Sequence, residues 1–274
     1  MTTGQTAGAR DETAHRDVRF DFTGSWVLVT GASRGIGLGV AEGFADAGAD
    51  LVLLADDPEL PAVAERMRNR ASGRIDGRVC DVRDRDGLAE VAAGLDRLDV
   101  LVSNAGIELR TPLGDPDAGV DERFAHVTDV NVQGTWNVLR AFSPVLAGGG
   151  RVVMTSSIWG RTGQADFAAY SASKHAIIGL TRTLAREFGP RGISVNAVCP
   201  GWVRTDAAIR SLEAIAGDEG ESRDAMLERI LAAQALPGLM GPPDMAETFL
   251  FLASAAARNI TGQAITVDRG ETCV

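Results

Sequence analysis

The chain has 274 residues, 45% hydrophobic and 23% charged, which is enough apolar material to bury the core of one large domain or two small ones. This balance excludes collagen-like, low-complexity and disordered chains, and no apolar run reaches the roughly eighteen residues needed to cross a membrane. The net charge of −10 argues against a nucleic-acid or anionic-membrane surface, because such partners require a positive field.

Residues 1–20 are polar and aperiodic, so we expect a disordered extension there, and they lack the apolar core of a secretory signal. Residues 21–274 contain no internal repeat and no clear linker, which favours a single domain. Cys80, Cys199 and Cys273 are odd in number and far apart, so they match neither a disulfide framework nor a zinc pattern. These features predict a reduced, cytoplasmic protein without a metal site.

Short apolar segments alternate with segments of helical type along the chain. The expected strands are 26–30, 51–55, 77–80, 98–102, 151–156, 193–198 and 264–267. The expected helical stretches are 36–44, 61–71, 116–146, 167–188 and 243–254, with a helical or loop region at 205–236. The alternation predicts an α/β fold, a doubly wound parallel sheet of about seven strands with helices on both faces. Ligands of such sheets bind beyond the carboxyl ends of the strands.

A glycine-rich turn, TGASRGIG at 30–37, joins the first strand to the first helix. Glycines here permit a tight turn and let backbone amides approach a pyrophosphate at the helix N-terminus. The alternative is an ordinary tight turn between a strand and a helix.

Polar and small residues also follow the second and fourth strands. Asp56 and Asp57 end the second strand about twenty residues after the glycine turn, where a carboxylate can accept hydrogen bonds from ribose hydroxyls. The alternative is a capping carboxylate for the following helix; we favour the cofactor role for Asp56 and leave Asp57 open. The small residues of Ser103–Gly106 would let the chain pass close to a cofactor, although such a motif is ordinary loop chemistry by itself.

Tyr170 and Lys174 are the only tyrosine and the only lysine in the chain, and a spacing of four places them on one face of a helix. A neighbouring ammonium favours the phenolate and so lowers the pKa of a phenol from about 10, which suits it to proton exchange with an alcohol or carbonyl oxygen. Ser157, at the end of a strand, could hydrogen-bond the same oxygen. The alternative is a surface tyrosine beside a solvated lysine.

From roughly Phe22 to Gly270 the chain resembles the short-chain dehydrogenase/reductase family, in its shorter single-domain form. The resemblance rests on TGASRGIG at 30–37, DV at 81–82, NAG at 104–106, NVQG at 131–134, SS at 156–157, YSASK at 170–174, PG at 200–201 and ITGQ at 260–263. It implies one Rossmann-type dehydrogenase domain over residues 21–274. It also implies a homotetramer in which the helices starting near residues 116 and 167 pack across the interfaces.

By that resemblance, Asn131, Ser157, Tyr170 and Lys174 form a catalytic tetrad. Tyr170 is the acid–base and Ser157 orients the substrate oxygen. Lys174 lowers the pKa of Tyr170 and holds the nicotinamide ribose, while Asn131 holds a water on a proton relay. The residues expected to bind the cofactor are Gly31, Ser33, Arg34, Gly35, Ile36, Gly37, Asp56, Asp81, Val82, Asn104, Ala105, Gly106, Tyr170, Lys174, Pro200, Gly201, Val203 and Thr205.

Two residues favour different cofactors. Arg34 resembles family members that prefer NADP, where a basic side chain meets the 2′-phosphate, whereas a carboxylate at Asp56 would repel that phosphate. The usual NAD-selecting acid of the family falls one residue earlier, where this chain has Ala55, but no arginine follows at the strand end to hold a phosphate. We expect NAD, with NADP as the alternative.

The segment CPGWVRT at 199–205 and the helical insert after it resemble bacterial 3-hydroxybutyrate, polyol and sugar dehydrogenases. Where hydroxybutyrate enzymes grip a carboxylate, this chain has Glu108, Trp159, Phe167 and Ser211, so we exclude that activity. A neutral polyol, sugar or ring alcohol fits best, bound by Ser157, Tyr170, Glu108, Trp159 and Trp202. Glu108 could instead be an exposed loop acid, and the tryptophans could pack under a lid.

The expected lid covers about 204–238, where apolar residues recur near helical spacing; they could instead complete the core. We therefore expect an NAD-dependent oxidoreductase that interconverts a secondary alcohol and a ketone by hydride transfer, with small-molecule partners only. One alternative is an NADP-dependent biosynthetic ketoreductase, which Arg34 supports. Another is a non-catalytic cofactor-sensing protein of the same fold, which the complete tetrad argues against.

Overall fold

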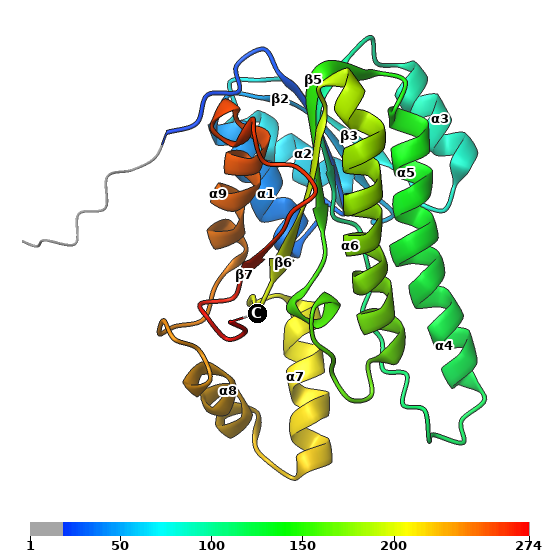
Figure 1. Cartoon of the computed structure of the whole chain (residues 1–274), viewed down its shortest axis with the longest axis vertical. Helices are drawn as coiled ribbons and strands as arrows, with labels where there is room; N and C mark the ends of the chain where they lie inside the picture. The colour runs from blue at the N-terminus through cyan, green and yellow to red at the C-terminus, as the bar shows by residue number, and fades with distance from the viewer. Residues whose placement is uncertain (1–18, 274) are drawn as a thin grey trace, which may run out of the picture.

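The computed structural model describes residues 19–273, and a seven-stranded parallel sheet runs through its centre (Figure 1). The strands are β1 (Trp26–Thr30), β2 (Asp50–Ala55), β3 (Ile75–Val79), β4 (Leu98–Ser103), β5 (Leu146–Thr155), β6 (Ser194–Pro200) and β7 (Ala264–Val267). Their order in the sheet is β3-β2-β1-β4-β5-β6-β7. The direction of winding reverses between β1 and β4, which is the position where sheets of this kind bind ligands.

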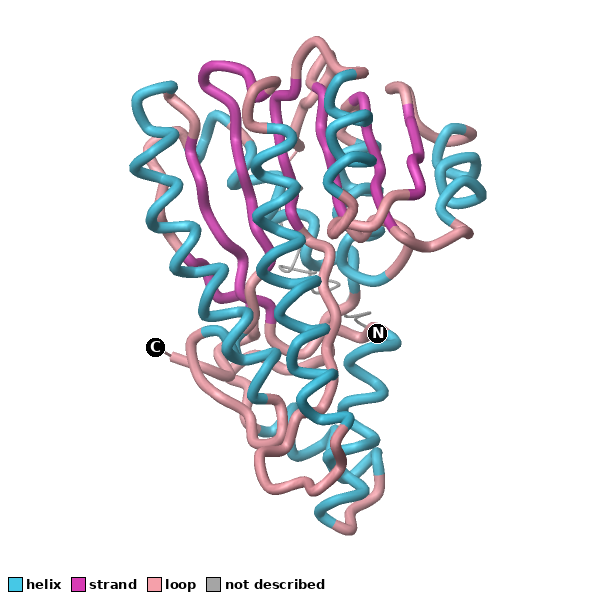
Figure 2. Tube along the Cα trace, turned by 90° about the vertical axis from the view of Figure 1, so that its right-hand side faces the viewer, coloured by secondary structure: helices cyan, strands magenta, loops and turns pink. Residues whose placement is uncertain are grey.

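Helices cover both faces of the sheet (Figure 2). One layer contains α1 (Gly35–Asp46), α2 (Leu60–Arg68) and α9 (Pro242–Ala253). The other contains α3 (Arg85–Ala93), α4 (Gly119–Thr128), α5 (Thr135–Phe142) and α6 (Ala168–Phe188). The remaining pair, α7 (Asp206–Glu219) and α8 (Arg223–Ala232), projects beyond the carboxyl ends of the strands (Figure 1).

Two hydrophobic cores, one on each face, explain why the central strands are mostly apolar. In β1, Val27 and Val29 pack in the core with α1 and α9, whereas Leu28 packs in the core with α5 and α6. All three side chains are fully buried. Because successive side chains of a strand point to opposite faces, a sheet covered on both sides favours apolar residues at successive positions.

The structure confirms the doubly wound parallel sheet and all seven predicted strands. It also contains α3, a short helix that has no counterpart among the predicted elements. Asp84 caps the start of α3 by accepting a hydrogen bond from the Gly87 amide at 3.0 Å. The helical stretch expected over 116–146 is divided into α4, a π-helical segment (Asp129–Gly134) and α5, and it ends before β5 begins.

The disordered extension expected over residues 1–20 lies almost wholly outside the described residues, which start at Arg19. Phe20, which is among the described residues, packs against the core on the α1 side of the sheet. Among residues 19–273, no helix combines the length and the hydropathy needed to cross a membrane.

The start of α1 packs on two loops with no space for a side chain at Gly37. A Cβ atom there would lie 2.1 Å from the Gly31 carbonyl oxygen and 2.5 Å from Asn104 Nδ2. The first atom belongs to the turn after β1 and the second to the loop after β4. Gly37 therefore sets how closely α1 approaches the point where the winding reverses.

We predict that Gly37→Ala lowers the free energy of unfolding by about 1–3 kcal/mol, because backbone atoms must move to admit the methyl group. Gly179→Ala is the matched control, since Gly179 is an exposed position of α6 with no atom within 4 Å of an added Cβ. The control should raise stability by roughly 0.5–1 kcal/mol through helix propensity. Urea unfolding measures both, and equal effects of the two substitutions would contradict the packing argument.

Candidate active site

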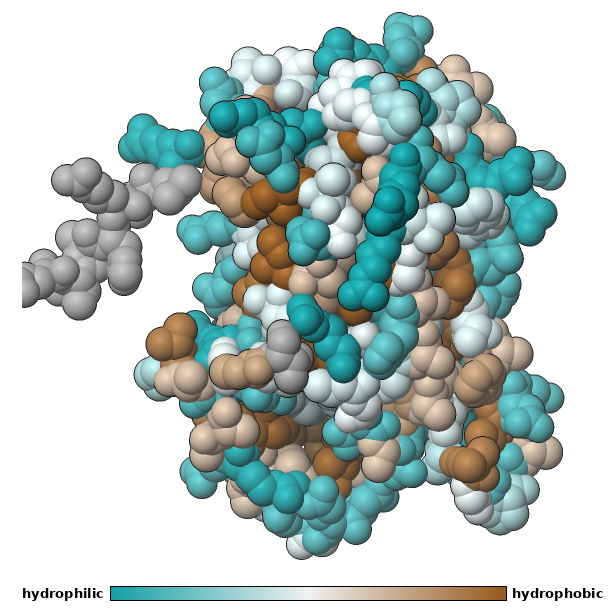
Figure 3. All heavy atoms as spheres, in the orientation of Figure 1, coloured by the Kyte–Doolittle hydropathy of each residue, from teal (hydrophilic) through white to brown (hydrophobic). Residues whose placement is uncertain are grey.

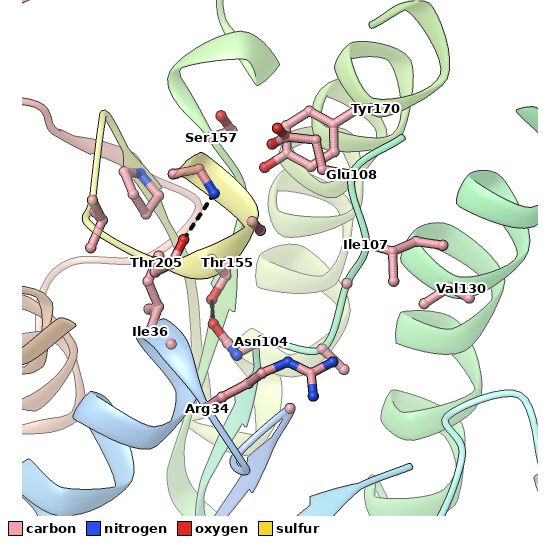
Figure 4. A pocket seen from close by; sticks show the side chains of 18 of the residues that line it. Arg34, Ile36, Asn104, Ile107, Glu108, Val130, Thr155, Ser157, Tyr170 and Thr205 are labelled. Atoms are coloured by element: carbon pink, nitrogen blue, oxygen red, sulfur yellow. Dashed lines mark hydrogen bonds between the residues drawn. The ribbon is translucent and has the colours of Figure 1, made fainter. Parts of the chain in front are cut away.

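A cleft of ≈ 460 Å³ opens at the carboxyl ends of the strands (Figure 4). The predicted residues that line it are Gly31, Ser33, Arg34, Gly35, Ile36, Asp56, Asp81, Val82, Asn104, Ala105, Gly106, Glu108, Ser157, Trp159, Tyr170, Lys174, Pro200, Gly201, Trp202, Val203 and Thr205. Gly37 and Asn131 are the two predicted residues outside this lining: Gly37 packs behind the glycine turn, and Asn131 is buried behind Gly106.

The N-terminus of α1 enters the cleft with its backbone amides uncapped. Its N-cap residue, Arg34, is extended and makes no side-chain capping bond, and the first turn contains no acid. The helices α3, α7 and α8 differ, because Asp84, Thr205 and Ser222 cap them. Free amides at a helix start, next to a Gly31 whose φ of +66° favours glycine, form a donor set suited to a pyrophosphate.

Hydrogen bonds centred on Thr30 hold the floor of the cleft together. Its Oγ1 accepts the backbone N–H groups of Asn104 and Ala105, both at 3.0 Å. Asn104 Nδ2 donates to the Thr30 carbonyl at 3.1 Å, and Asn104 Oδ1 accepts from Thr155 Oγ1 at 3.1 Å. The ends of β1, β4 and β5 are thereby fixed to one another, as Figure 4 shows for Asn104 and Thr155.

Lys174 is buried where α6 meets the end of β5, with 5% of its surface exposed. Its Nζ donates to the Thr155 carbonyl at 3.0 Å, and its own carbonyl accepts from Ser156 Oγ at 2.8 Å. Burial lowers the pKa of Lys174 from 10.5 to about 8, although the Glu108 carboxylate acts against this change. The ammonium is therefore mostly protonated at neutral pH but carries a desolvation cost.

Tyr170 lies beside Ser157 and Glu108 at the inner end of the cleft (Figure 4). Trp159 packs edge-on against its ring, with 5.8 Å between ring centroids, and Lys174 Nζ lies 5.4 Å from the ring centroid. Burial, followed by the charge of Glu108, raises the pKa of Tyr170 above its ordinary value of 10, while Ser157 acts to lower it. The sequence-based expectation of a lowered pKa is wrong for this structure, because burial and the charge of Glu108 outweigh the hydrogen bond with Ser157.

Asn131 lies in the π-helical segment and clamps the loop after β4. Its Oδ1 accepts the Ile107 amide at 2.8 Å, and its Nδ2 donates to the Ile107 carbonyl at 2.9 Å and to Ser173 Oγ at 3.0 Å. A Cβ atom on Gly106 would lie 3.1 Å from Asn131 Oδ1 and 3.3 Å from Lys174 Nζ. Asn131 and Lys174 thus approach each other across Gly106, where an added Cβ would be in tight contact with both side chains.

Glu108 is a partly buried acid rather than an exposed loop residue. Burial raises the pKa of its carboxyl, and Ser211, Lys174 and Arg210 each act to lower it. Ser211 Oγ donates a hydrogen bond to Glu108 Oε1, which connects α7 to the loop after β4. The carboxylate therefore lies between Tyr170 on one side and α7 on the other.

The two acids after β2, Asp56 and Asp57, have different surroundings. Asp56 is exposed and lines the cleft, whereas Asp57 does not. Asp57 Oδ1 accepts the Glu59 amide at 3.0 Å just before α2, and Asp57 Oδ2 pairs with Arg34 Nη1 at 2.6 Å. The guanidinium at the edge of the cleft is thus already bound to a carboxylate.

Helices α7 and α8 form the segment expected as a lid. Leu212, Ala216 and Met226 pack with Trp202 in a small cluster that is separate from the two main cores. Figure 3 shows apolar surface in the hollow between these projecting helices. Arg110 pairs with Asp218 of α7, so this segment is attached to the loop after β4 by an ion pair as well as by Ser211.

Several residues of the cleft were not among the predicted ones: Ala55, Cys80, Ile107, Leu109, His126, Val130, Thr155, Ser156, Ile158, Asp206, Ala207, Ala208 and Arg210. Thr155 and Ser156 end a predicted strand, so the rule that ligands bind at strand ends could have identified them. Arg210 carries no such signal, because its position depends on how α7 folds back over the sheet.

Comparisons with known proteins agree with this geometry. Residues 31–272 match a family model described as "Enoyl-(Acyl carrier protein) reductase". Oxidoreductase UcpA of Escherichia coli O157:H7 is 39% identical over 262 residues, which cover 91% of this chain and 95% of UcpA. A Streptomyces virginiae protein, provisionally named the ketoacyl reductase of monensin polyketide synthase, is 37% identical over 254 residues, covering 89% and 95%.

A solved structure from Beutenbergia cavernae is also similar to this chain. It is provisionally named an NAD(P)-dependent gluconate 5-dehydrogenase and contains NADP at low occupancy. The two chains are 37% identical, with a TM-score of 0.79 and coverage of 93% of this chain and 99% of the other.

We predict that Lys174→Met stabilises the protein without cofactor at pH 7 by up to roughly 3 kcal/mol, the free energy equivalent of lowering a pKa from 10.5 to about 8. Between these values the unfolded chain binds more protons than the folded one, so the stability of the wild type rises with pH. The advantage of the variant must therefore shrink as pH increases from 7 to 10.

The matched control is Arg182→Met, which removes a cation from an exposed position of the same helix. Denaturant unfolding at several pH values measures the free energy of unfolding. For Arg182→Met, the difference in this free energy from the wild type should not change with pH. A Lys174→Met variant that is less stable at pH 7, or whose advantage persists at pH 10, would contradict the assigned burial cost.

Proposed function

The chain belongs to the short-chain dehydrogenase/reductase family, and from that premise we propose that it is an NAD-dependent enzyme that interconverts a secondary alcohol and a ketone. One observation carries the proposal: Ser157, Tyr170 and Lys174 meet at one end of a cleft whose other end contains the uncapped start of α1. A proton-transfer group and an anion-binding turn in one cleft are what a nicotinamide-dependent dehydrogenase requires.

The residues present fit a nicotinamide dinucleotide. The uncapped amides after Gly31 would hold its pyrophosphate, and the loop at Asn104–Gly106, which is narrow because of Gly106, would let it lie close to the strand ends. When bound, the nicotinamide accepts or supplies the hydride, and its oxidised form adds a positive charge to the site. A positive charge there would lower the pKa of Tyr170, whereas Glu108 raises it.

Tyr170 is proposed to transfer the proton. In ketone reduction its phenol donates to the developing alkoxide, and the raised pKa of Tyr170 keeps the phenol protonated until that moment. The Lys174 ammonium, 5.4 Å from the ring centroid, stabilises the phenolate that remains. Ser157 is positioned to hydrogen-bond the same substrate oxygen, and Asn131, beside Lys174, would hold the water of a proton relay.

The preference for NAD is supported by the charges at the edge of the cleft. Asp56 lines this edge as an exposed carboxylate, suited to ribose hydroxyls and unfavourable for a 2′-phosphate. Arg34, which would favour NADP, is bound to Asp57 at 2.6 Å. The alternative is an NADP-dependent ketoreductase. It is supported by the relative that contains NADP and by the relative named as a ketoacyl reductase.

The proposed substrate is a polyol, a sugar or a related ring alcohol. Glu108 provides a partly buried acceptor for hydroxyl groups beside Tyr170, and Trp159 and Trp202 provide aromatic surface, with ring centroids 5.9 Å apart. The name of the Beutenbergia relative points to a sugar-derived substrate as well. Helices α7 and α8 would close over such a substrate and exclude water.

A homotetramer is part of the proposal. Phe124 of α4 and Trp136 of α5 are large apolar side chains with 43% and 38% of their surfaces exposed. Both lie on the helical layer that includes α6, so a second subunit packed there would bury them.

We predict that Tyr170→Phe lowers kcat about 10²–10⁴-fold, since it removes the proton-transfer group, and leaves NADH binding unchanged. The assay follows nicotinamide absorbance with NAD and NADP in parallel over a panel of polyols, sugars and cyclic alcohols, and NADH fluorescence reports binding. The wild type should show the larger kcat/KM with NAD.

Ser171→Ala serves as the control, because it removes a hydroxyl from the next position of α6 and Ser171 does not line the cleft. It should keep the wild-type rate. Turnover that survives Tyr170→Phe would sink the catalytic assignment, and tight NADH binding without turnover on any alcohol would favour the cofactor-sensing alternative.

A further inference from the structure

Three strongly basic side chains line the cleft, and two of them already have partners. Arg34 is paired with Asp57 at the edge near α1, and Lys174 donates to the Thr155 carbonyl at the inner end. The third is Arg210 of α7, whose guanidinium has no ion pair or hydrogen bond with any residue in the range 19–273. A guanidinium that lines a cleft without a protein partner is available to bind an anionic group of a ligand.

The lack of a partner for Arg210 does not come from a shortage of acids. The chain contains 37 acidic and 27 basic residues, an excess of ten acids. Three other arginines of the same region are paired: Arg110 with Asp166 and Asp218, Arg223 with Glu213 and Asp224, and Arg229 with Glu219 and Glu221. Arg204 resembles Arg210 in having no ion pair with a described residue, but Arg204 does not line the cleft. Asp206, one turn before Arg210 on α7, also lines the cleft but is not within ion-pairing distance of it.

Arg210 belongs to the substrate side of the cleft. Its neighbour Ser211 donates to Glu108, and the charge of Arg210 itself acts on the Glu108 carboxyl. Glu108 in turn acts on Tyr170. The sequence of groups from the reacting end outward is therefore a phenol, a hydroxyl acceptor and a free guanidinium.

We propose that Arg210 binds a carboxylate of the substrate, so that the preferred substrate is a hydroxylated carboxylic acid rather than a neutral polyol. The inference rests on the proposed function and deepens it. In this arrangement the reacting carbon of the substrate lies at Tyr170 and Ser157, and a neighbouring hydroxyl of the substrate donates a hydrogen bond to Glu108. The substrate carboxylate accepts two parallel hydrogen bonds from the guanidinium N–H groups of Arg210. The neutral substrate expected from Glu108 and the two tryptophans is revised accordingly, because no sequence pattern predicts that α7 brings a cation to the cleft.

The test compares aldonates of four to six carbons with the alditols of the same length, using the protein saturated with NADH. Binding is measured by calorimetry, which needs no turnover. The wild type should bind at least one aldonate about tenfold or more tightly than the matching alditol, the difference expected for a charge-assisted bidentate contact. Arg210→Gln should abolish this preference, and in steady-state assays it should raise KM for the aldonate by a much larger factor than KM for the alditol.

The matched control is Arg223→Gln, which removes the same charge from α8 at a position that does not line the cleft. It should keep the preference. The assignment is overturned if no aldonate binds more tightly than its alditol, if the preference survives Arg210→Gln, or if Arg223→Gln removes it equally.

These outcomes are distinguishable from failure of the proposed function. Oxidation of an alditol with NAD that depends on Tyr170, without any preference for aldonates, leaves the dehydrogenase activity intact and rejects only the role of Arg210. Loss of NADH affinity in Arg210→Gln, followed by fluorescence, would assign the guanidinium to the cofactor instead.

Discussion

A buried ammonium is the constraint around which the site is organised. Lys174 has 5% of its surface exposed, and its Nζ is held by the Thr155 carbonyl at 3.0 Å. Two glycines give it space: a Cβ on Gly106 would lie 3.3 Å from Nζ, and a Cβ on Gly160 would lie 2.8 Å from the Lys174 carbonyl. Because a cation without solvent is costly, the surrounding strand ends and α6 must be placed within narrow limits.

The same burial explains how the other ionisable groups behave. Desolvation opposes charge on Tyr170, Lys174 and Glu108 alike. It raises the pKa of Tyr170 and of Glu108 and lowers the pKa of Lys174, so it favours the neutral form of each group. Such a site gains from any ligand that supplies the missing charges or hydrogen bonds. The burial of these ionisable groups therefore costs the unliganded protein stability, and a ligand that binds the folded state offsets that cost.

Much of this arrangement follows from local patterns in the sequence, and the remainder does not. Apolar runs identified the strands because both faces of the sheet are covered, and Tyr170 and Lys174 were identifiable as the only residues of their kinds. The short α3 was missed because it has only two large apolar residues, Leu88 and Val91, and its start depends on the Asp84 cap. The direction of the Tyr170 pKa and the position of Arg210 depend on tertiary burial, which no spacing encodes.

The most direct test of this account uses the fact that the chain contains one lysine. Lysine labelled with ¹³C at Cε gives a single NMR signal for Lys174, and no assignment is needed to follow its titration. The account predicts that the protein without cofactor titrates at about 8. A midpoint near the ordinary 10.5 would show a solvated lysine, and it would contradict the buried ammonium on which the catalytic arrangement depends.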